Sequence, residues 1–104
     1  MRIEVTILGL KTPQRYAVRR AVLAAQIALS QEYPDLQVEI AEVWQRSEIE
    51  KITPIISYPS LVVNDRLVCV GRFPRKGDIM TWFRQALQEE AQESEFDGKA
   101  IQRS

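Results

Sequence analysis

The chain of 104 residues contains no histidine and a single cysteine, Cys69. One thiol cannot form an internal disulfide, and without histidine neither the common zinc and haem sites nor a Ser-His or Cys-His nucleophile can be built. The acidic side chains show no spacing that is typical of a carboxylate metal site. We therefore expect no dithiol redox chemistry, no metal and no cofactor.

Neither sign of charge is in excess, and no long apolar run is present. There are 14 basic and 14 acidic side chains, whereas a nucleic-acid-binding domain normally carries a basic excess. No apolar run approaches the length of about 18 residues that a membrane span needs, and no secretory signal begins the chain. These features predict a cytoplasmic single-domain protein that binds neither nucleic acid nor a membrane.

The first half of the chain predicts a strand, a helix and a second strand. Apolar and polar residues alternate over residues 2–8 and again over 36–40, which is typical of strands with one buried face. Between them, Thr12 is expected to cap a helix that has Pro13 in its first turn and continues to about Tyr33. This order implies a right-handed crossover between parallel strands.

A short helix and a hairpin are predicted next. Ser47 and Glu50 have the spacing of a capping box, and Pro54 must end the helix that they start. Apolar runs at residues 61–63 and 66–70 flank Asn64 and Asp65, a pair that favours a tight two-residue turn.

The register of this hairpin and the last helix complete the expected fold. A two-residue turn sets Ser60 opposite Cys69 and places the thiol on the apolar face of Val62 and Leu67. After Pro74 an apolar stripe predicts a last helix that ends near Leu87. We expect residues 1–87 to form the domain and residues 88–104 to form a polar, acid-rich tail, frayed or disordered.

The order βαβαββα, with Pro59 directly before the third strand, resembles the thioredoxin fold. More narrowly, it is similar to the small redox-active disulfide proteins of archaea and bacteria. The resemblance covers about residues 2–87 and is strongest over residues 58–65 and 70–74. It implies an α/β fold with a four-stranded mixed sheet, helices on both faces, and a cis peptide bond between Tyr58 and Pro59.

The chain departs from this family at the redox motif. Where the family has its two cysteines, the chain has Thr12, Pro13, Gln14 and Arg15, so that Thr12 replaces the attacking cysteine and Arg15 the resolving one. A threonine hydroxyl at a helix start stays protonated unless a base is supplied. Tyr58 also stands where the family usually has a small residue. The departures predict a protein without dithiol oxidoreductase activity.

The first functional hypothesis is a non-catalytic module that binds a protein partner or a second copy of itself. Its candidate interface includes Tyr58, Trp82 and an alanine stripe along the first helix, formed by Ala17, Ala21, Ala24 and Ala28. Such a stripe allows close helix packing, either against the last helix or against another subunit. A weaker resemblance, in Gly9 and in Thr12 followed by Pro13, links the chain to the KaiB family of clock proteins, which have no redox pair.

Two other hypotheses stay open. Lys11, Thr12 and Arg15 surround a helix start, which favours a small anionic ligand; alternatively, these basic side chains are solvated or paired with Glu42 and Glu48. An enzyme using Thr12 or Cys69 is disfavoured, because neither residue has a base in view and a lone cysteine usually packs as a small apolar residue.

Overall fold

The computed structural model describes residues 1–54 and 57–103, and side chains as far as residue 91. Within these residues the chain forms, in order, β1 (Arg2–Leu8), α1 (Thr12–Leu29), β2 (Gln37–Val43), α2 (Arg46–Ile52), β3 (Ser60–Val63), β4 (Arg66–Val70) and α3 (Lys76–Arg103). The predicted α/β class is confirmed. In the described part of the chain, no helix is both long and apolar enough to cross a membrane.

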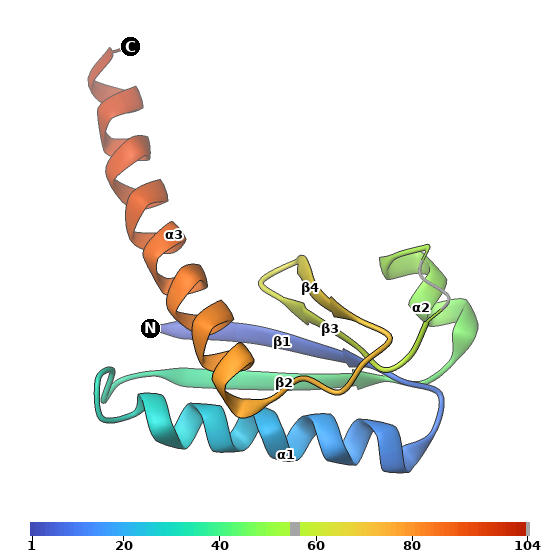
Figure 1. The fold of residues 1–104 in the computed structure, drawn as a ribbon. Helices are drawn as coiled ribbons and strands as arrows, with labels where there is room; N and C mark the ends of the chain where they lie inside the picture. Colours follow the sequence, from blue (N-terminus) through green and yellow to red (C-terminus); the bar gives the residue numbers. More distant parts are fainter. Residues whose placement is uncertain (55–56, 104) are drawn as a thin grey trace.

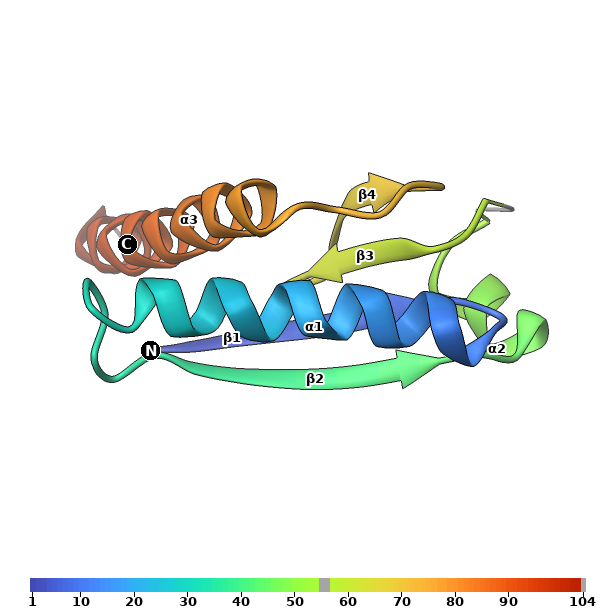
Figure 2. The ribbon, with the colours of Figure 1, turned by 60° about the horizontal axis from the view of Figure 1, so that its bottom comes forward.

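The four strands form one mixed sheet in the order β2-β1-β3-β4 (Figure 1). The β1 and β2 strands are parallel, as the crossover predicted, while β3 is antiparallel to both β1 and β4. The α1 helix runs along the sheet beside the first turns of α3, and both views of the ribbon show these two helices next to one another (Figure 2).

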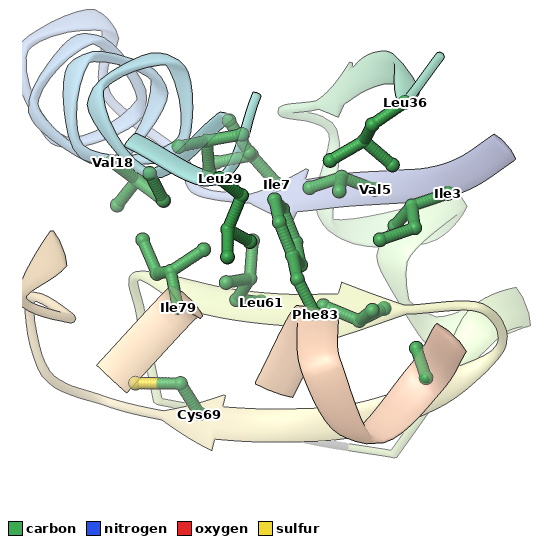
Figure 3. Packing of buried hydrophobic residues seen from close by; sticks show 14 of the residues in the cluster. Ile3, Val5, Ile7, Val18, Leu29, Leu36, Leu61, Cys69, Ile79 and Phe83 are labelled. Atoms are coloured by element: carbon green, nitrogen blue, oxygen red, sulfur yellow. The ribbon is translucent and has the colours of Figure 1, made fainter. Parts of the chain in front are cut away.

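The main hydrophobic core lies between the sheet and the helices α1 and α3 (Figure 3). Alternate residues of β1 and β3 enter it, namely Ile3, Val5, Ile7, Leu61 and Val63. The helices contribute their buried stripes, Val18, Val22, Ala25 and Leu29 from α1 and Ile79, Phe83, Ala86 and Leu87 from α3. Each large side chain buried in this way contributes about 1.5–3 kcal/mol. A second, smaller cluster joins Leu8, Ile49 and Val62.

Both predicted helix caps are wrong. Lys11 is the N-cap of α1, and Thr12 is its first helical residue. Because Thr12 already has helical geometry it does not cap the helix, and its hydroxyl accepts a hydrogen bond from Arg15 Nη2 at 3.1 Å. Gln45 is the N-cap of α2, with no side-chain cap bond, and this places Ser47 inside the first turn.

Both long helices end at residues other than predicted. The α1 helix stops at Leu29, and the chain reaches Tyr33 through a turn in which the Tyr33 amide donates to Leu29 O at 2.9 Å. The α3 helix continues past Leu87 to Arg103, because residues 88–103 are rich in strong helix formers such as Gln, Glu and Ala. Whether residues 88–104 form a separate tail stays a prediction, and the side chains of Phe96 and Ile101 lie outside the described residues.

The predicted hairpin turn is confirmed. Asn64 and Asp65 have positive φ angles of 47° and 64°, as a tight turn of this kind requires. The Asn64 side chain also accepts the Glu4 amide at 2.9 Å, and the Asn64 amide donates to Glu4 O at 2.9 Å. The turn is therefore anchored to β1.

The predicted register fails halfway along β4. Val62 pairs with Leu67, but Leu61, not Ser60, pairs with Cys69, and the register shifts between Leu61 and Val62. An extra residue in one strand is a β-bulge, and it moves every following side chain to the other face. Cys69 consequently lies in the main core, on the face of Leu61 instead of that of Val62.

Candidate functional site

The ends of all four strands meet along one edge of the domain. Across the sheet, Val43 of β2 pairs with Leu8 of β1, Leu8 with Ser60 of β3, and Ser60 with Val70 of β4. The loops that continue from this row must lie at the same end of the sheet. We define the sheet-end surface as the following residues of these loops and of the first turn of α1: Leu10, Lys11, Thr12, Trp44, Tyr58 and Phe73.

Two large aromatic side chains of the sheet-end surface are exposed. Trp44 and Phe73 each expose 54% of their surface, and Leu10 exposes 37%. Sequence reasoning did not select these three residues. The sequence indicates their position after strands but not their exposure: Trp44 follows the last residue of β2 directly, and Phe73 follows Gly71 and Arg72 at the end of β4.

A shallow groove of about 310 Å³ adjoins Trp44. Its apolar wall consists of Val43, Trp44 and Ile52, and its rim consists of Glu42, Gln45, Glu48 and Lys51. Ile52 is 47% exposed, so α2 presents an apolar side chain beside the tryptophan. The groove lies between the end of β2 and α2, and its apolar wall extends the apolar part of the sheet-end surface.

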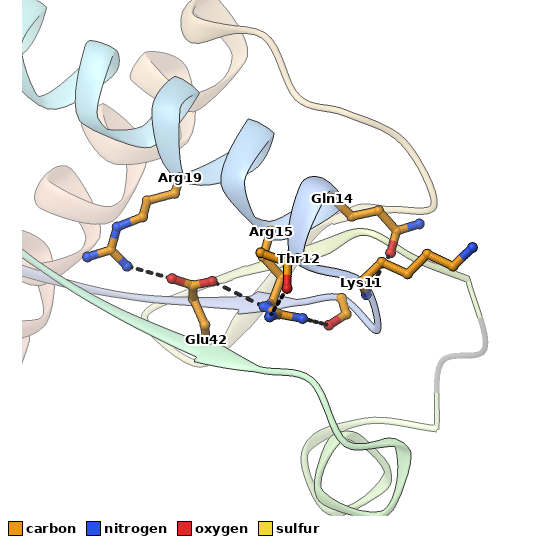
Figure 4. Close-up of polar contacts among 7 residues, drawn as sticks. Lys11, Thr12, Gln14, Arg15, Arg19 and Glu42 are labelled. Atoms are coloured by element: carbon orange, nitrogen blue, oxygen red, sulfur yellow. Dashed lines mark hydrogen bonds and ion pairs between the residues drawn. The ribbon is translucent and has the colours of Figure 1, made fainter.

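Arg15 holds the start of α1 against Glu42 of β2 (Figure 4), and its guanidinium also lies over Trp44. Its Nε donates to Glu42 Oε1 at 3.2 Å, its Nη1 donates to Gly9 O at 3.1 Å, and its guanidinium lies 5.3 Å from the centre of the Trp44 ring. Arg19 Nη1 donates to the second carboxylate oxygen of Glu42 at 2.7 Å. Only 13% of the Arg15 side chain is exposed. Arg15 therefore acts as a clamp that orients Trp44.

The other residues at the redox-motif position are more open. Lys11, Thr12 and Pro13 are exposed, and Gln14 is half-buried, with its side-chain oxygen 3.4 Å from the Lys11 amide that donates to it. Glu48 pairs with Lys51 of α2 and not with a basic residue of α1. The structure thus brings Lys11, Thr12 and Arg15 together, but commits the Arg15 guanidinium to Glu42.

The Tyr58–Pro59 segment precedes β3 at this end of the sheet. The peptide bond between these residues is cis, and Pro59 is fully buried. Tyr58 packs half-buried against the second cluster, and Pro59 O accepts the Gly71 amide at 2.8 Å. Gly71 has φ +69°, and a Cβ there would lie 2.9 Å from Ser57 Cβ, so this position requires glycine.

Cys69 lies apart from the sheet-end surface, inside the core. It is 3% exposed, and its thiol donates to Arg72 O at 3.4 Å. Burial raises the pKa of the Cys69 thiol, and the positive charge of Arg72 opposes this rise only in part. A reactive cysteine needs a lowered pKa and access to solvent, and Cys69 has neither.

The alanine stripe and Trp82 lie elsewhere. Ala17 is exposed, Ala24 and Ala28 are half-buried, and Ala21 packs against the core. Trp82 is half-buried against the same core, in a groove between α3 and the hairpin, with the Arg72 guanidinium 5.9 Å from its ring centre. The larger exposed apolar residues of α1 are Tyr16, Leu23 and Ile27, which sequence reasoning missed. Of these predicted interface residues Ala17 is the exposed one, and a role of the others in binding stays a prediction.

No group of three or more potential metal-ligating side chains occurs among the described residues. In the same part of the chain, every buried side-chain nitrogen or oxygen has a hydrogen-bond partner. Comparison of the sequence with protein-family models and with curated proteins gives no match. Function therefore has to be argued from the geometry of the chain itself.

Proposed function

We propose that this chain is a non-catalytic, thioredoxin-like module that binds a protein partner at its sheet-end surface. The order βαβαββα, the parallel crossover and the cis Tyr58–Pro59 bond at the same end of the sheet as the start of the first helix support a thioredoxin-like arrangement. In that arrangement, the partner occupies the place where a redox relative would hold its substrate.

A thioredoxin-like sheet carries helices on both faces, and the two clusters of buried residues support this. Neighbouring strand residues point to opposite faces. Leu61 packs with residues of α1 and α3, whereas Val62, the next residue, packs with Ile49 of α2. We infer that α2 lies on the face opposite α1 and α3.

The absence of catalysis is inferred from the groups at the motif positions. The Thr12 hydroxyl accepts a hydrogen bond from Arg15, a cation, which cannot serve as the base that a threonine nucleophile needs. Cys69 is buried with a raised pKa. Neither residue has the surroundings of an activated nucleophile.

The observation that carries the proposal is the pair of exposed aromatic residues, Trp44 and Phe73, at the end of the sheet. Aromatic residues and arginine are enriched at protein interfaces and depleted from ordinary surfaces. The Arg15 guanidinium lies over one face of the Trp44 ring, and this contact lowers the side-chain entropy that is lost when a partner covers the other face. A tryptophan held in this way beside an apolar groove fits a partner that inserts an apolar side chain.

Binding of a small anion at Lys11, Thr12 and Arg15 is the alternative. The exposed Lys11 favours it, because no ion pair of its ammonium group is found among the described side chains. The geometry supports this function less well, since Arg15 would have to leave Glu42 to reach a ligand.

Site-specific photo-crosslinking in cells of the source organism tests the protein-binding proposal. A photoreactive amino acid replaces Phe73 in one variant and Thr81 in the control, because Thr81 is also exposed but belongs to α3. We expect one discrete cross-linked protein from position 73 and none from position 81. The same product should disappear when Trp44→Glu is added, since a charge there removes the apolar contact.

A lack of any product from position 73, or equal products from both positions, would contradict the proposal. An insulin-reduction assay tests the non-catalytic part separately. Catalysed reduction above the rate without protein would contradict the non-catalytic part of the proposal and would point to Cys69, the one thiol in the sequence.

A further inference from the structure

The β2 strand leaves one edge of the sheet open. Among the described strands it has one hydrogen-bonded neighbour, β1, and it pairs with β1 without interruption over all seven of its residues. Figure 2 shows it as the outermost strand, with β1 and α1 on one side only. The opposite edge, β4, is shorter and contains the bulge. Short or bulged edges resist pairing with another strand, whereas long regular ones invite it.

The backbone groups on this edge have a fixed pattern. The Gln37 amide donates to Met1 O at 2.9 Å, and Val43 O accepts the Gly9 amide at 3.1 Å, so both residues point their backbone groups towards β1. Because this direction alternates along a strand, the backbone groups of Val38, Ile40 and Glu42 point away from β1. Each of these residues offers one donor and one acceptor to a further strand.

The acidic side chains of β2 do not repel such a strand strongly. Glu39 pairs with Arg2 at 2.7 Å, and Glu42 pairs with Arg19 at 2.7 Å and with Arg15 at 3.2 Å. A charged side chain on an edge strand normally discourages pairing. Here each carboxylate is compensated by an arginine of its own chain.

We propose that a second copy of this chain pairs antiparallel with β2 about a two-fold axis at Ile40. Ile40 then lies opposite its own counterpart, Val38 lies opposite Glu42, and Glu39 lies opposite Ala41. All residues whose backbone groups point outward form hydrogen-bonded pairs in this register, as a self-complementary interface requires. The pairing joins two four-stranded sheets into one.

Neighbouring registers are less favourable. Centring the axis on Glu39 would place two Glu39 carboxylates opposite each other, and like charges at such positions destabilise a sheet. Centring it on Ala41 would leave Val38 opposite Trp44, which lies beyond the strand. The pattern of β2 therefore selects Ile40 as the centre.

This dimer goes beyond the proposed function, because it uses the long edge of the sheet and not the aromatic residues at its end. Its test depends on Ala41, which is exposed in the single chain. Ala41→Glu places a carboxylate opposite Glu39 of the second copy, twice by symmetry. Ala41→Lys, the matched control, places an opposite charge there. Circular dichroism verifies that both variants fold.

Sedimentation equilibrium over a range of concentrations measures the result. We expect the native chain to dimerise, Ala41→Glu to weaken the dimer about tenfold, and Ala41→Lys to keep or strengthen it. The double variant Glu39→Lys with Ala41→Glu should restore the dimer, because a lysine at position 39 of one copy then lies opposite a glutamate at position 41 of the other. A native chain that remains monomeric at every concentration, or a dimer that both Ala41 variants weaken equally, would overturn the proposal.

Discussion

Removal of the negative charge at Glu42 is the most informative perturbation of the structure. Glu42 is 27% exposed and compensates both Arg19 and Arg15, the latter only 13% exposed. Its matched control is Glu39, three residues away on the same strand, which pairs with Arg2 at 2.7 Å while both side chains are more than half exposed. The two carboxylates differ mainly in burial.

The expected magnitudes follow from that difference. Exposed ion pairs contribute about 0.2–1 kcal/mol, whereas leaving a fully buried charge without its partner costs about 3–5 kcal/mol. Arg15 and Glu42 lie between these limits, so Glu42→Gln should lower the free energy of unfolding by about 1–2 kcal/mol. Glu39→Gln should lower it by less than about 0.5 kcal/mol.

Thermal unfolding followed by circular dichroism measures both variants, at a dilution where the chain is monomeric. A loss of 1 kcal/mol lowers the Tm of a domain of this size by about 4–8 °C. A double-mutant cycle with Arg15→Met should give a coupling of about 1 kcal/mol to Glu42. Equal losses from Glu39→Gln and Glu42→Gln, or no coupling to Arg15, would refute the view that Arg15 is a buried clamp.

Three further outcomes are expected. Gly71→Ala should destabilise the protein by about 2 kcal/mol in urea unfolding, because the φ of +69° disfavours a side chain and Ser57 blocks the Cβ. The control Gly77→Ala should be neutral or stabilising, since a Cβ at that position meets nothing within 4 Å. A harmless Gly71→Ala would show that this turn is not constrained. Cys69 should react with a thiol reagent at pH 7 at least about tenfold more slowly in the native than in the urea-unfolded protein, and fast labelling of the native protein would contradict the burial. Because the pKa of the thiol is raised in the folded protein, the thiol of the unfolded chain ionises first as the pH rises. The free energy of unfolding should therefore fall as the pH rises through the ordinary thiol range towards the raised pKa. If the chain bound inorganic phosphate with a Kd of 1 mM, phosphate at ten times that concentration would add about 1.4 kcal/mol of stability. We expect the native chain to show no shift in Tm beyond that caused by chloride at equal ionic strength, and Glu42→Gln to show a larger shift because Arg15 is released. A clear phosphate-specific shift in the native chain would favour the anion-binding alternative.

Alternation and turn chemistry were sufficient to predict the strands and the hairpin turn, whereas the four-stranded mixed sheet was implied by the resemblance. The strands β1 and β2 have one apolar face each, and Asn64 and Asp65 adopt the positive φ angles that their turn needs. These are local properties, set by side-chain direction and backbone sterics, so the sequence carries them directly.

Features that depend on distant contacts could not be predicted in this way. The bulge that moves Cys69 into the core is a property of the pairing between β3 and β4, and no residue in β4 marks it. Thr12 does not cap α1 because it already has helical geometry, and its hydroxyl accepts a hydrogen bond from Arg15. Arg15 itself is held by Glu42, 27 positions along the chain.

The candidate site shows the same division. Position in the fold identified Thr12, Arg15 and Tyr58, since the end of the first strand and the start of the third are readable in the sequence. The exposure of Trp44 and Phe73 was not readable, because an aromatic residue after a strand is buried or exposed according to what packs over it. In this chain the structure leaves both exposed.

The central claim is that the sheet-end surface binds a protein, and a titration of the isotopically labelled chain tests it most directly. The amide NMR spectrum would be recorded with increasing amounts of the partner identified by cross-linking. We predict that the largest shifts occur at Leu10, Trp44 and Phe73, including the Trp44 indole. Shifts confined to the outer face of α1, at Tyr16, Leu23 and Ile27, would contradict it.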